Sequence, residues 1–197
     1  SSTYLTTLLD FSDPGQLNVF LNADEVDLRA KQVEQDGMMS GKSLALGFNM
    51  LRSNDLIWSY VVNNYLKGKT PPPFDILYWN SDPTNLPAKM YNTYIREMYV
   101  NNNLSKPGEF SCCGKPIELN KIKTPSYFLS AIEDHIAPWK TTFLGTELLG
   151  GPAEFVLGGS GHIAGVINPP VKNKRNFWTD GKLHQGAGHW LETATNL

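Results

Sequence analysis

Two short apolar segments in the last third of the chain constrain its fold most strongly. They cover residues 126–130 and 153–157, and a helical pattern over 139–149 lies between them. A strand, a helix and a second strand in this order are typical of a βαβ unit, in which the strands are parallel and the helix covers one face of the sheet. Residues 3–9 are β-branched and apolar, and predict a further buried strand. The fold class is therefore predicted to be α/β.

The region between the first strand and the βαβ unit has a different pattern. A capping box starts a helix over 22–36, and helical patterns follow at 40–51, 53–68 and 88–101, with an extended segment at 74–79 and a small hairpin at 110–119. Since a helical block interrupts the strand–helix alternation, we expect an inserted, mainly helical cap subdomain. The expected organisation is a core strand in 1–12, the cap in 13–86 and the rest of the core in 87–197. Four aromatic residues of the cap are expected mostly to pack it, or else to line an apolar tunnel: Phe48, Trp58, Tyr60 and Tyr65.

Composition limits the classes of partner and compartment. The chain has 197 residues and a formal net charge of −2, which gives no reason to expect nucleic acid as a partner. No apolar stretch is long enough for a transmembrane segment, and no signal-peptide pattern is visible. The two cysteines are adjacent, which disfavours a disulfide and provides no metal-binding spacing, so a reducing compartment and no metal site are expected. Because the chain begins without Met in a strand-like segment, we expect it to be a fragment.

Two loops carry the residues that point to chemistry. Residues 133–139 (EDHIAPW) follow one predicted strand and residues 158–165 (GGSGHIAG) follow the next. Sites in open α/β sheets form at the carboxyl ends of the strands, and an acid followed by a histidine is the chain order of α/β hydrolases. A buried Asp134 bound to Nδ1 of His162 would fix the tautomer of the ring and stabilise the imidazolium. The alternatives are a helix cap for Asp134 and an ordinary loop residue for His162.

A nucleophile is harder to find. The chain contains neither G-x-S-x-G nor G-x-C-x-G. Ser160 is flanked by glycines but lies on the same loop as His162, so a structural role is favoured. Cys112 and Cys113 fall in the expected hairpin, without a helix N-terminus to lower a thiol pKa. The other two histidines, His184 and His189, lie in a polar tail and are expected to be solvated or at a helix end. The predicted triad is therefore incomplete.

Several strings of this sequence resemble the polyhydroxyalkanoate synthases, most closely the class I type that acts on short-chain hydroxyacyl groups. The strings are 5–11 (LTTLLDF), 54–68 (NDLIWSYVVNNYLKG), 77–82 (LYWNSD), 133–139 (EDHIAPW) and 161–170 (GHIAGVINPP). The resemblance spans nearly the whole chain and implies the C-terminal part of an α/β-hydrolase fold. It implies that Asp134 is the triad acid and His162 the general base. His135 beside the acid has either a supporting role or a core or capping role, and Trp79 lies at a subunit or cap contact or in the core.

The resemblance also implies a reaction and partners. Such an enzyme is an acyltransferase that polymerises 3-hydroxyacyl-coenzyme A into polyester through a Cys-His-Asp triad, and needs no cofactor because the coenzyme A thioester is the substrate. The family's cysteine lies upstream of the first strand, so this chain alone is expected to be inactive. Expected partners are the growing polyester, its cytoplasmic granule, and a second copy or the missing N-terminal segment. The basic residues 172–175 form a solvated turn or meet coenzyme A phosphates. Two alternatives are an esterase or polyester depolymerase with a serine nucleophile, and a non-catalytic binding module at the granule.

Overall fold

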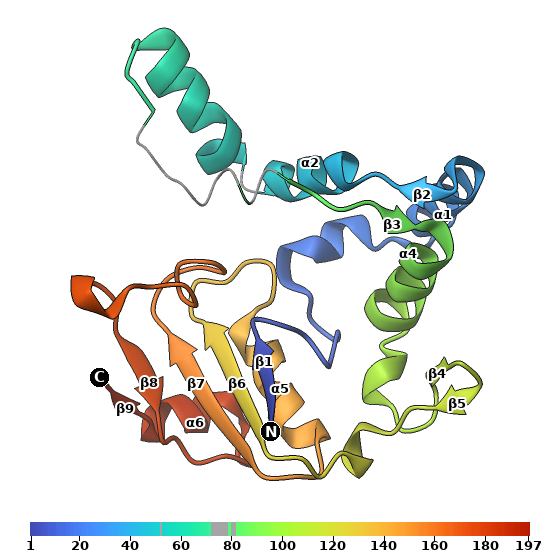
Figure 1. Ribbon diagram of the computed structural model, residues 1–197, viewed down its shortest axis with the longest axis vertical. Coiled ribbons are helices and arrows are strands. Elements are labelled where there is room, and N and C mark those ends of the chain that lie inside the picture. Colours follow the sequence, from blue (N-terminus) through green and yellow to red (C-terminus); the bar gives the residue numbers. More distant parts are fainter. Residues whose placement is uncertain (52, 72–78, 80–81) are drawn as a thin grey trace. The chain divides into compact units, whose positions relative to one another are not determined.

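The computed structural model describes residues 1–51, 53–71, 79 and 82–197 of the chain (Figure 1). These residues form two compact units. Unit 1 consists of Ser1–Asn22 and Ile95–Leu197, and unit 2 consists of Ala23–Tyr94. Unit 1 contains the principal sheet and both loops singled out above, and unit 2 is mainly helical. The predicted α/β class is confirmed.

The principal sheet of unit 1 has five strands in the order β1-β6-β7-β8-β9. Their bounds are β1 Ser2–Leu5, β6 Ser126–Ala131, β7 Ala153–Gly158, β8 Phe177–Thr179 and β9 Thr195–Asn196. The strands β1, β6 and β7 are parallel, whereas β8 and β9 each run antiparallel to their predecessor in the sheet. The strand predicted over 3–9 is shorter than expected, because the chain leaves the sheet at Thr6, where φ is 42°.

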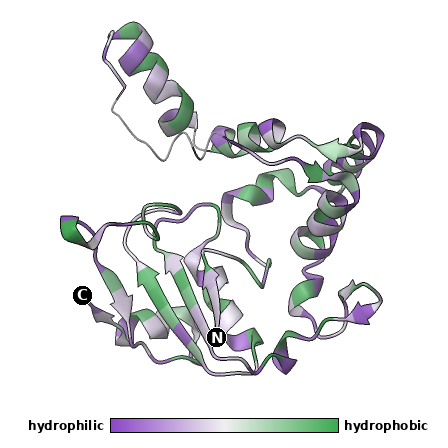
Figure 2. Cartoon of the chain, in the orientation of Figure 1, coloured by the Kyte–Doolittle hydropathy of each residue, from purple (hydrophilic) through white to green (hydrophobic). Residues whose placement is uncertain are grey.

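Two helices and the sheet enclose an aromatic core. The helices α5 (Trp139–Leu148) and α6 (Gly186–Thr193) lie behind the strands in Figure 1, and β7 carries its most hydrophobic residues toward its carboxyl end (Figure 2). The rings of Phe143 and Trp190 each meet Phe155 edge to face, with centroids 5.0 and 4.8 Å apart. Such pairs stabilise a core beyond their buried area. Trp190 is 1% exposed, so the C-terminal segment is part of the core and its interpretation as a polar tail is wrong.

Shorter elements complete unit 1. The helical turns are η1 Gly15–Phe20, η4 Ile95–Val100, η5 Asn103–Ser105, η6 Leu119–Lys121 and η7 Pro170–Lys172. The predicted hairpin is formed by β4 (Ser111–Cys112) and β5 (Lys115–Pro116), which pair antiparallel. A second buried cluster joins Leu8 and Phe11, just after β1, to Met98 and Ala137.

Unit 2 is built around two packed helices. Its elements are α1 Ala23–Asp36, β2 Met38–Met39, α2 Gly41–Leu51, η2 Asn54–Trp58, η3 Val61–Leu66, β3 Leu86–Pro87 and α4 Ala88–Tyr94. The buried Asn92 of α4 donates its side-chain N–H groups to the carbonyl of Ala30 (3.2 Å) and to Oε1 of Glu34 (3.1 Å), both on α1. The strands β2 and β3 pair antiparallel beside them.

The sequence-based expectations for this region meet the structure in different ways. The helices predicted over 22–36 and 40–51 are confirmed to within one residue. The extended segment expected at 74–79 lies outside the described residues apart from Trp79, which is exposed. The expected packing of aromatic side chains is wrong for Trp58, Tyr60 and Tyr65, which are 56%, 39% and 84% exposed.

The boundaries between the two units fall eight to ten residues later than the expected limits of the cap. Residues 13–22 belong to unit 1, because Thr141 of α5 donates its hydroxyl to the carbonyl of Asp13 (2.9 Å). Residues 87–94 belong to unit 2, because α4 packs on α1. Among the described residues, no helix combines the length and the apolar character needed to cross a bilayer.

Candidate catalytic acid–base pair

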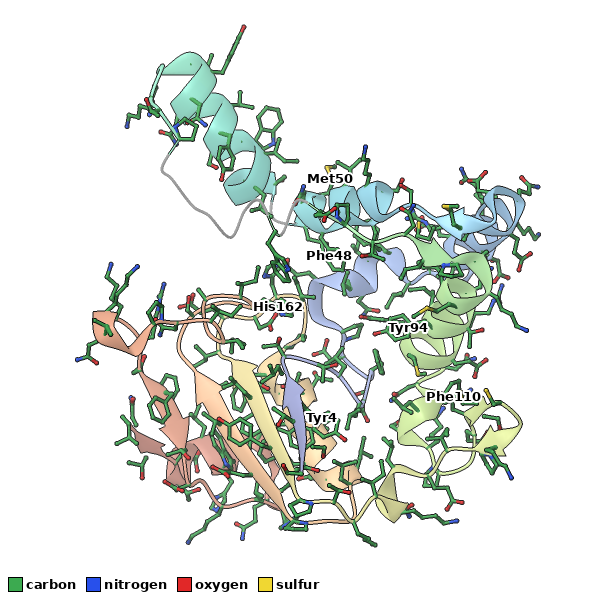
Figure 3. All side chains as sticks on the ribbon, in the orientation of Figure 1. Tyr4, Phe48, Met50, Tyr94, Phe110 and His162 are labelled. Carbon is green, nitrogen blue, oxygen red and sulfur yellow. The ribbon has the colours of Figure 1, made fainter. Side chains whose placement is uncertain are left out.

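The two loops singled out in the sequence meet at one edge of the principal sheet. The strand β6 ends at Ala131 and β7 ends at Gly158, and the two strands are parallel neighbours. Their carboxyl ends therefore lie side by side, and so do the loops that follow them. Figure 3 shows His162 at this edge, beyond the ends of the strands.

Asp134 lies on the first of these loops, and each of its carboxylate oxygens has a hydrogen-bond partner. Its Oδ1 accepts the backbone N–H groups of Ile136 (2.8 Å) and Ala137 (2.9 Å). The side chain has 0% exposure, so these donors, rather than water, balance its negative charge. Hydrogen bonds to a carboxylate are stronger than those between neutral groups. The bonds from Ile136 and Ala137 therefore fix the orientation of the carboxylate plane.

His162 contacts the other carboxylate oxygen of Asp134, Oδ2. The distance between Nδ1 of His162 and Oδ2 of Asp134 is 2.7 Å. An ionised carboxylate can only accept, so this contact requires the proton on Nδ1 and leaves Nε2 as the basic nitrogen. The His162 side chain is 30% exposed. The carboxylate of the pair is thus buried, whereas the imidazole side chain is partly exposed to solvent.

Glycines allow the second loop to approach the strand ends. A helical turn begins here, in which the N–H of Gly165 donates to the carbonyl of Gly161 (2.8 Å). A Cβ atom on Gly165 would lie 2.6 Å from Cβ of Ala131, which no side chain tolerates without displacement. His162 is therefore held within a turn that packs directly against the end of β6.

Ser160 connects the two loops through its backbone. Its carbonyl accepts the N–H of Glu133, the residue before the acid, at 3.0 Å. Its φ is 95°, a region that residues other than glycine rarely adopt. The backbone of Ser160 therefore joins the two loops, and the structural role of its side chain stays a prediction.

The remaining candidate residues lie in several places. His135 follows Asp134 on the same loop and is partly buried, and its supporting role stays a prediction. His184 is exposed and His189 lies in α6. Cys112 and Cys113 are exposed in the β4–β5 hairpin, which stands well apart from the edge that carries His162 (Figures 1 and 3). A hydrogen bond and charge repulsion between the two thiols raise the pKa of Cys112, which disfavours its thiolate.

Comparison with known proteins defines the class to which this fold belongs. Residues 6–169 match the α/β hydrolase fold family, so the chain belongs to that family. Over 98% of its length the chain is 49% identical to the poly(3-hydroxyalkanoate) polymerase subunit PhaC of Cupriavidus necator and 46% identical to that of Rhizobium meliloti. It is also 44% identical over 99% of its length to the poly(3-hydroxyalkanoate) polymerase of Methylorubrum extorquens. The resemblance to polyhydroxyalkanoate synthases is confirmed.

The match covers only part of each relative. The chain spans 34% of the Cupriavidus necator protein and 32% of each of the other two, about a third of the relatives' length.

Proposed function

We propose that this chain supplies the acid and the base of a Cys-His-Asp triad in an enzyme that polymerises 3-hydroxyacyl-coenzyme A into polyhydroxyalkanoate. The observation that carries the proposal is the 2.7 Å contact between Nδ1 of His162 and Oδ2 of Asp134, at the ends of adjacent parallel strands. The similarity to poly(3-hydroxyalkanoate) polymerases supports the choice of reaction.

The first step would transfer an acyl group to a thiol. With its proton held on Nδ1 by Asp134, His162 uses Nε2 to remove the proton of a cysteine thiol. The thiolate attacks the carbonyl carbon of the 3-hydroxyacyl thioester, the bond to the coenzyme A sulfur breaks, and the proton on His162 passes to the departing thiolate. The imidazolium formed between these events is stabilised by the buried Asp134 carboxylate, which itself stays ionised.

The second step would lengthen the polyester. The hydroxyl group of another 3-hydroxyacyl unit approaches the acyl thioester, and Nε2 of His162 removes its proton as the oxygen attacks. An ester bond forms, the enzyme thiol leaves, and the proton returns to sulfur. One base thus serves both transfers, and the partial exposure of the His162 side chain (30%) is compatible with this.

The thiol, on this proposal, comes from outside the 197 residues. Both cysteines of the chain lie in the β4–β5 hairpin, apart from His162, and the family resemblance places the nucleophile upstream of β1. We assign unit 2 as the cap subdomain. The granule surface and a second copy or an N-terminal segment are the proposed partners.

Complementation tests this proposal directly. The chain is mixed with the segment of the Cupriavidus necator polymerase that precedes the matching region, where the family resemblance implies the nucleophilic cysteine. Coenzyme A release from 3-hydroxybutyryl-coenzyme A is then followed by chromatography. We expect no release from the chain alone, release from the mixture, and loss of that release with His162→Gln. The matched control is His184→Gln, which changes an exposed histidine of the same unit and leaves release unchanged.

Two results would contradict the proposal. Release by the chain alone would show that it contains its own nucleophile. A mixture that binds but never releases coenzyme A would favour a non-catalytic binding module instead.

A further inference from the structure

The turn after β1 touches the acid loop from a distant part of the sequence. A Cβ atom placed on Gly15 would lie 2.7 Å from Cγ of Pro138 and 3.5 Å from the carbonyl oxygen of His135. Gly15 therefore packs against the loop just before and just after the two residues whose N–H groups bind Asp134. Only a residue without a side chain fits in this position.

Hydrogen bonds hold this turn in place. Asp13 accepts the N–H of Gly15 through Oδ1 (3.0 Å), and its carbonyl accepts the hydroxyl of Thr141 (2.9 Å). Thr141 is 3% exposed and lies in the first turn of α5, where its own N–H donates to the carbonyl of Pro138 (3.0 Å). The turn therefore contacts Pro138 in two ways. Gly15 packs against its ring, and Thr141 links Asp13 to its carbonyl group.

We infer that Gly15 and Thr141 are positioning residues, which set the orientation of the Asp134 carboxylate by fixing Pro138 and the loop before it. The chain of contacts is short. Gly15 limits the position of Pro138, Pro138 follows Ala137 directly, and the N–H of Ala137 binds Oδ1 of Asp134 at 2.9 Å. Because Oδ1 is fixed by these donors, Oδ2 is fixed toward Nδ1 of His162. The inference rests on the proposed function, since the orientation of Asp134 affects catalysis only if His162 is the base.

The tautomer of His162 reports this orientation without any need for activity. In the ¹⁵N-labelled chain, the chemical shifts of Nδ1 and Nε2 distinguish the two neutral tautomers at about pH 9, above the ordinary histidine range. His162→Gln identifies the resonances. We expect the unmodified chain to hold the Nδ1–H tautomer, and Gly15→Ala to lower the ratio of Nδ1–H to Nε2–H by about tenfold or more, as loss of one hydrogen bond to a charged group requires.

Two matched variants separate the contact from general strain. Gly15 and Gly108 have φ values of 62° and 80°, but a Cβ on Gly108 would meet nothing within 4 Å. Gly108→Ala therefore introduces a similar backbone penalty without the contact, and should leave the tautomer unchanged. Conversely, adding Pro138→Ala to Gly15→Ala removes the Cγ atom that is approached and should restore the Nδ1–H tautomer.

Each outcome decides the inference. An unchanged tautomer in folded Gly15→Ala overturns it, as does an equal change in Gly108→Ala or a failure of Pro138→Ala to rescue. If Gly15→Ala does not fold, Thr141→Val provides the test, because it removes only the hydroxyl bond to Asp13, and an unchanged tautomer there also refutes the inference. A mixed tautomer in the unmodified chain would instead contradict the acid–base pair, and with it the proposed function.

Discussion

The two oxygens of Asp134 allow its structural contribution and its proposed catalytic contribution to be separated by two substitutions. Asp134→Ala removes the acceptor of three hydrogen bonds, from Ile136, Ala137 and His162. Asp134→Asn keeps Oδ1 as an acceptor for the two backbone N–H groups and places an NH₂ group toward His162. Since Nδ1 must then accept, the imidazole proton moves to Nε2 and the base is lost.

The magnitudes follow from these contacts. An unsatisfied buried donor costs about 1–3 kcal/mol, so the buried N–H of Ala137, the partly buried N–H of Ile136 and the lost bond to His162 give about 3–5 kcal/mol for Asp134→Ala. Loss of the charge alone weakens the retained bonds by about half, which gives about 1–2 kcal/mol for Asp134→Asn. The difference of about 2 kcal/mol corresponds to roughly 30-fold in the opening equilibrium.

Native-state hydrogen exchange of the amides of β6 and β7 measures this difference within unit 1. We expect exchange about 30-fold faster in Asp134→Ala than in Asp134→Asn. Coenzyme A release in the complemented enzyme should fall in both variants, by about 10⁴-fold in Asp134→Asn, as the wrong tautomer does in comparable triads. Glu147→Ala, an exposed acid on α5, should change stability by less than about 0.5 kcal/mol. Equal exchange in the two Asp134 variants would refute the assignment of Oδ1 to the loop.

Three further predictions concern the surrounding fold. A Cβ on Gly145 would lie 2.8 Å from Phe128, so Gly145→Ala should destabilise unit 1 by about 1–3 kcal/mol in urea titrations, whereas Gly188→Ala, with nothing within 4 Å, should not. Ser160→Gly should stabilise unit 1 by up to about 1 kcal/mol, because glycine adopts the φ of 95° freely, and a loss of stability would contradict this. Burial raises the pKa of Tyr91 above 10.0. The Tyr91 hydroxyl therefore keeps its proton to a higher pH in folded unit 2 than in the unfolded chain. Its contribution to stability is complete below pH 10.0 and decreases above it. Tyr91→Phe should make the loss of stability with rising pH less steep in alkaline denaturation.

The central βαβ unit was predictable because its signals are local. The strands at 126–131 and 153–158 are short apolar runs, and α5 between them has a helical pattern. The sequence places a polar loop after each strand, and parallel pairing alone brings those loops to one edge. The proximity of Asp134 and His162 follows from these two facts.

The structure of the C-terminal segment was not predictable, because tertiary contacts rather than local sequence preferences stabilise it. The strands β8 and β9 are three and two residues long, and α6 begins Gly-Ala-Gly, a weak start for a helix. What holds α6 is Trp190, whose ring lies 4.8 Å from that of Phe155. No pattern in residues 177–197 indicates that contact, because the partner ring, Phe155, lies in β7.

The helix cap that the sequence offered as an alternative for Asp134 is wrong, because α5 begins at Trp139 after Pro138 and has no side-chain cap. Asp134 instead binds backbone N–H groups of its own loop. An Asp after a strand often binds backbone N–H groups two and three residues further along the chain, and Oδ1 does this with Ile136 and Ala137. That local bond leaves Oδ2 directed toward His162. This contact within the loop is therefore a condition for the proposed catalytic role, because a carboxylate free to rotate would share both oxygens between the ring and the backbone. The contact of Gly15 with Pro138 belongs to the same arrangement, and it joins positions too distant in the sequence for any local pattern to predict.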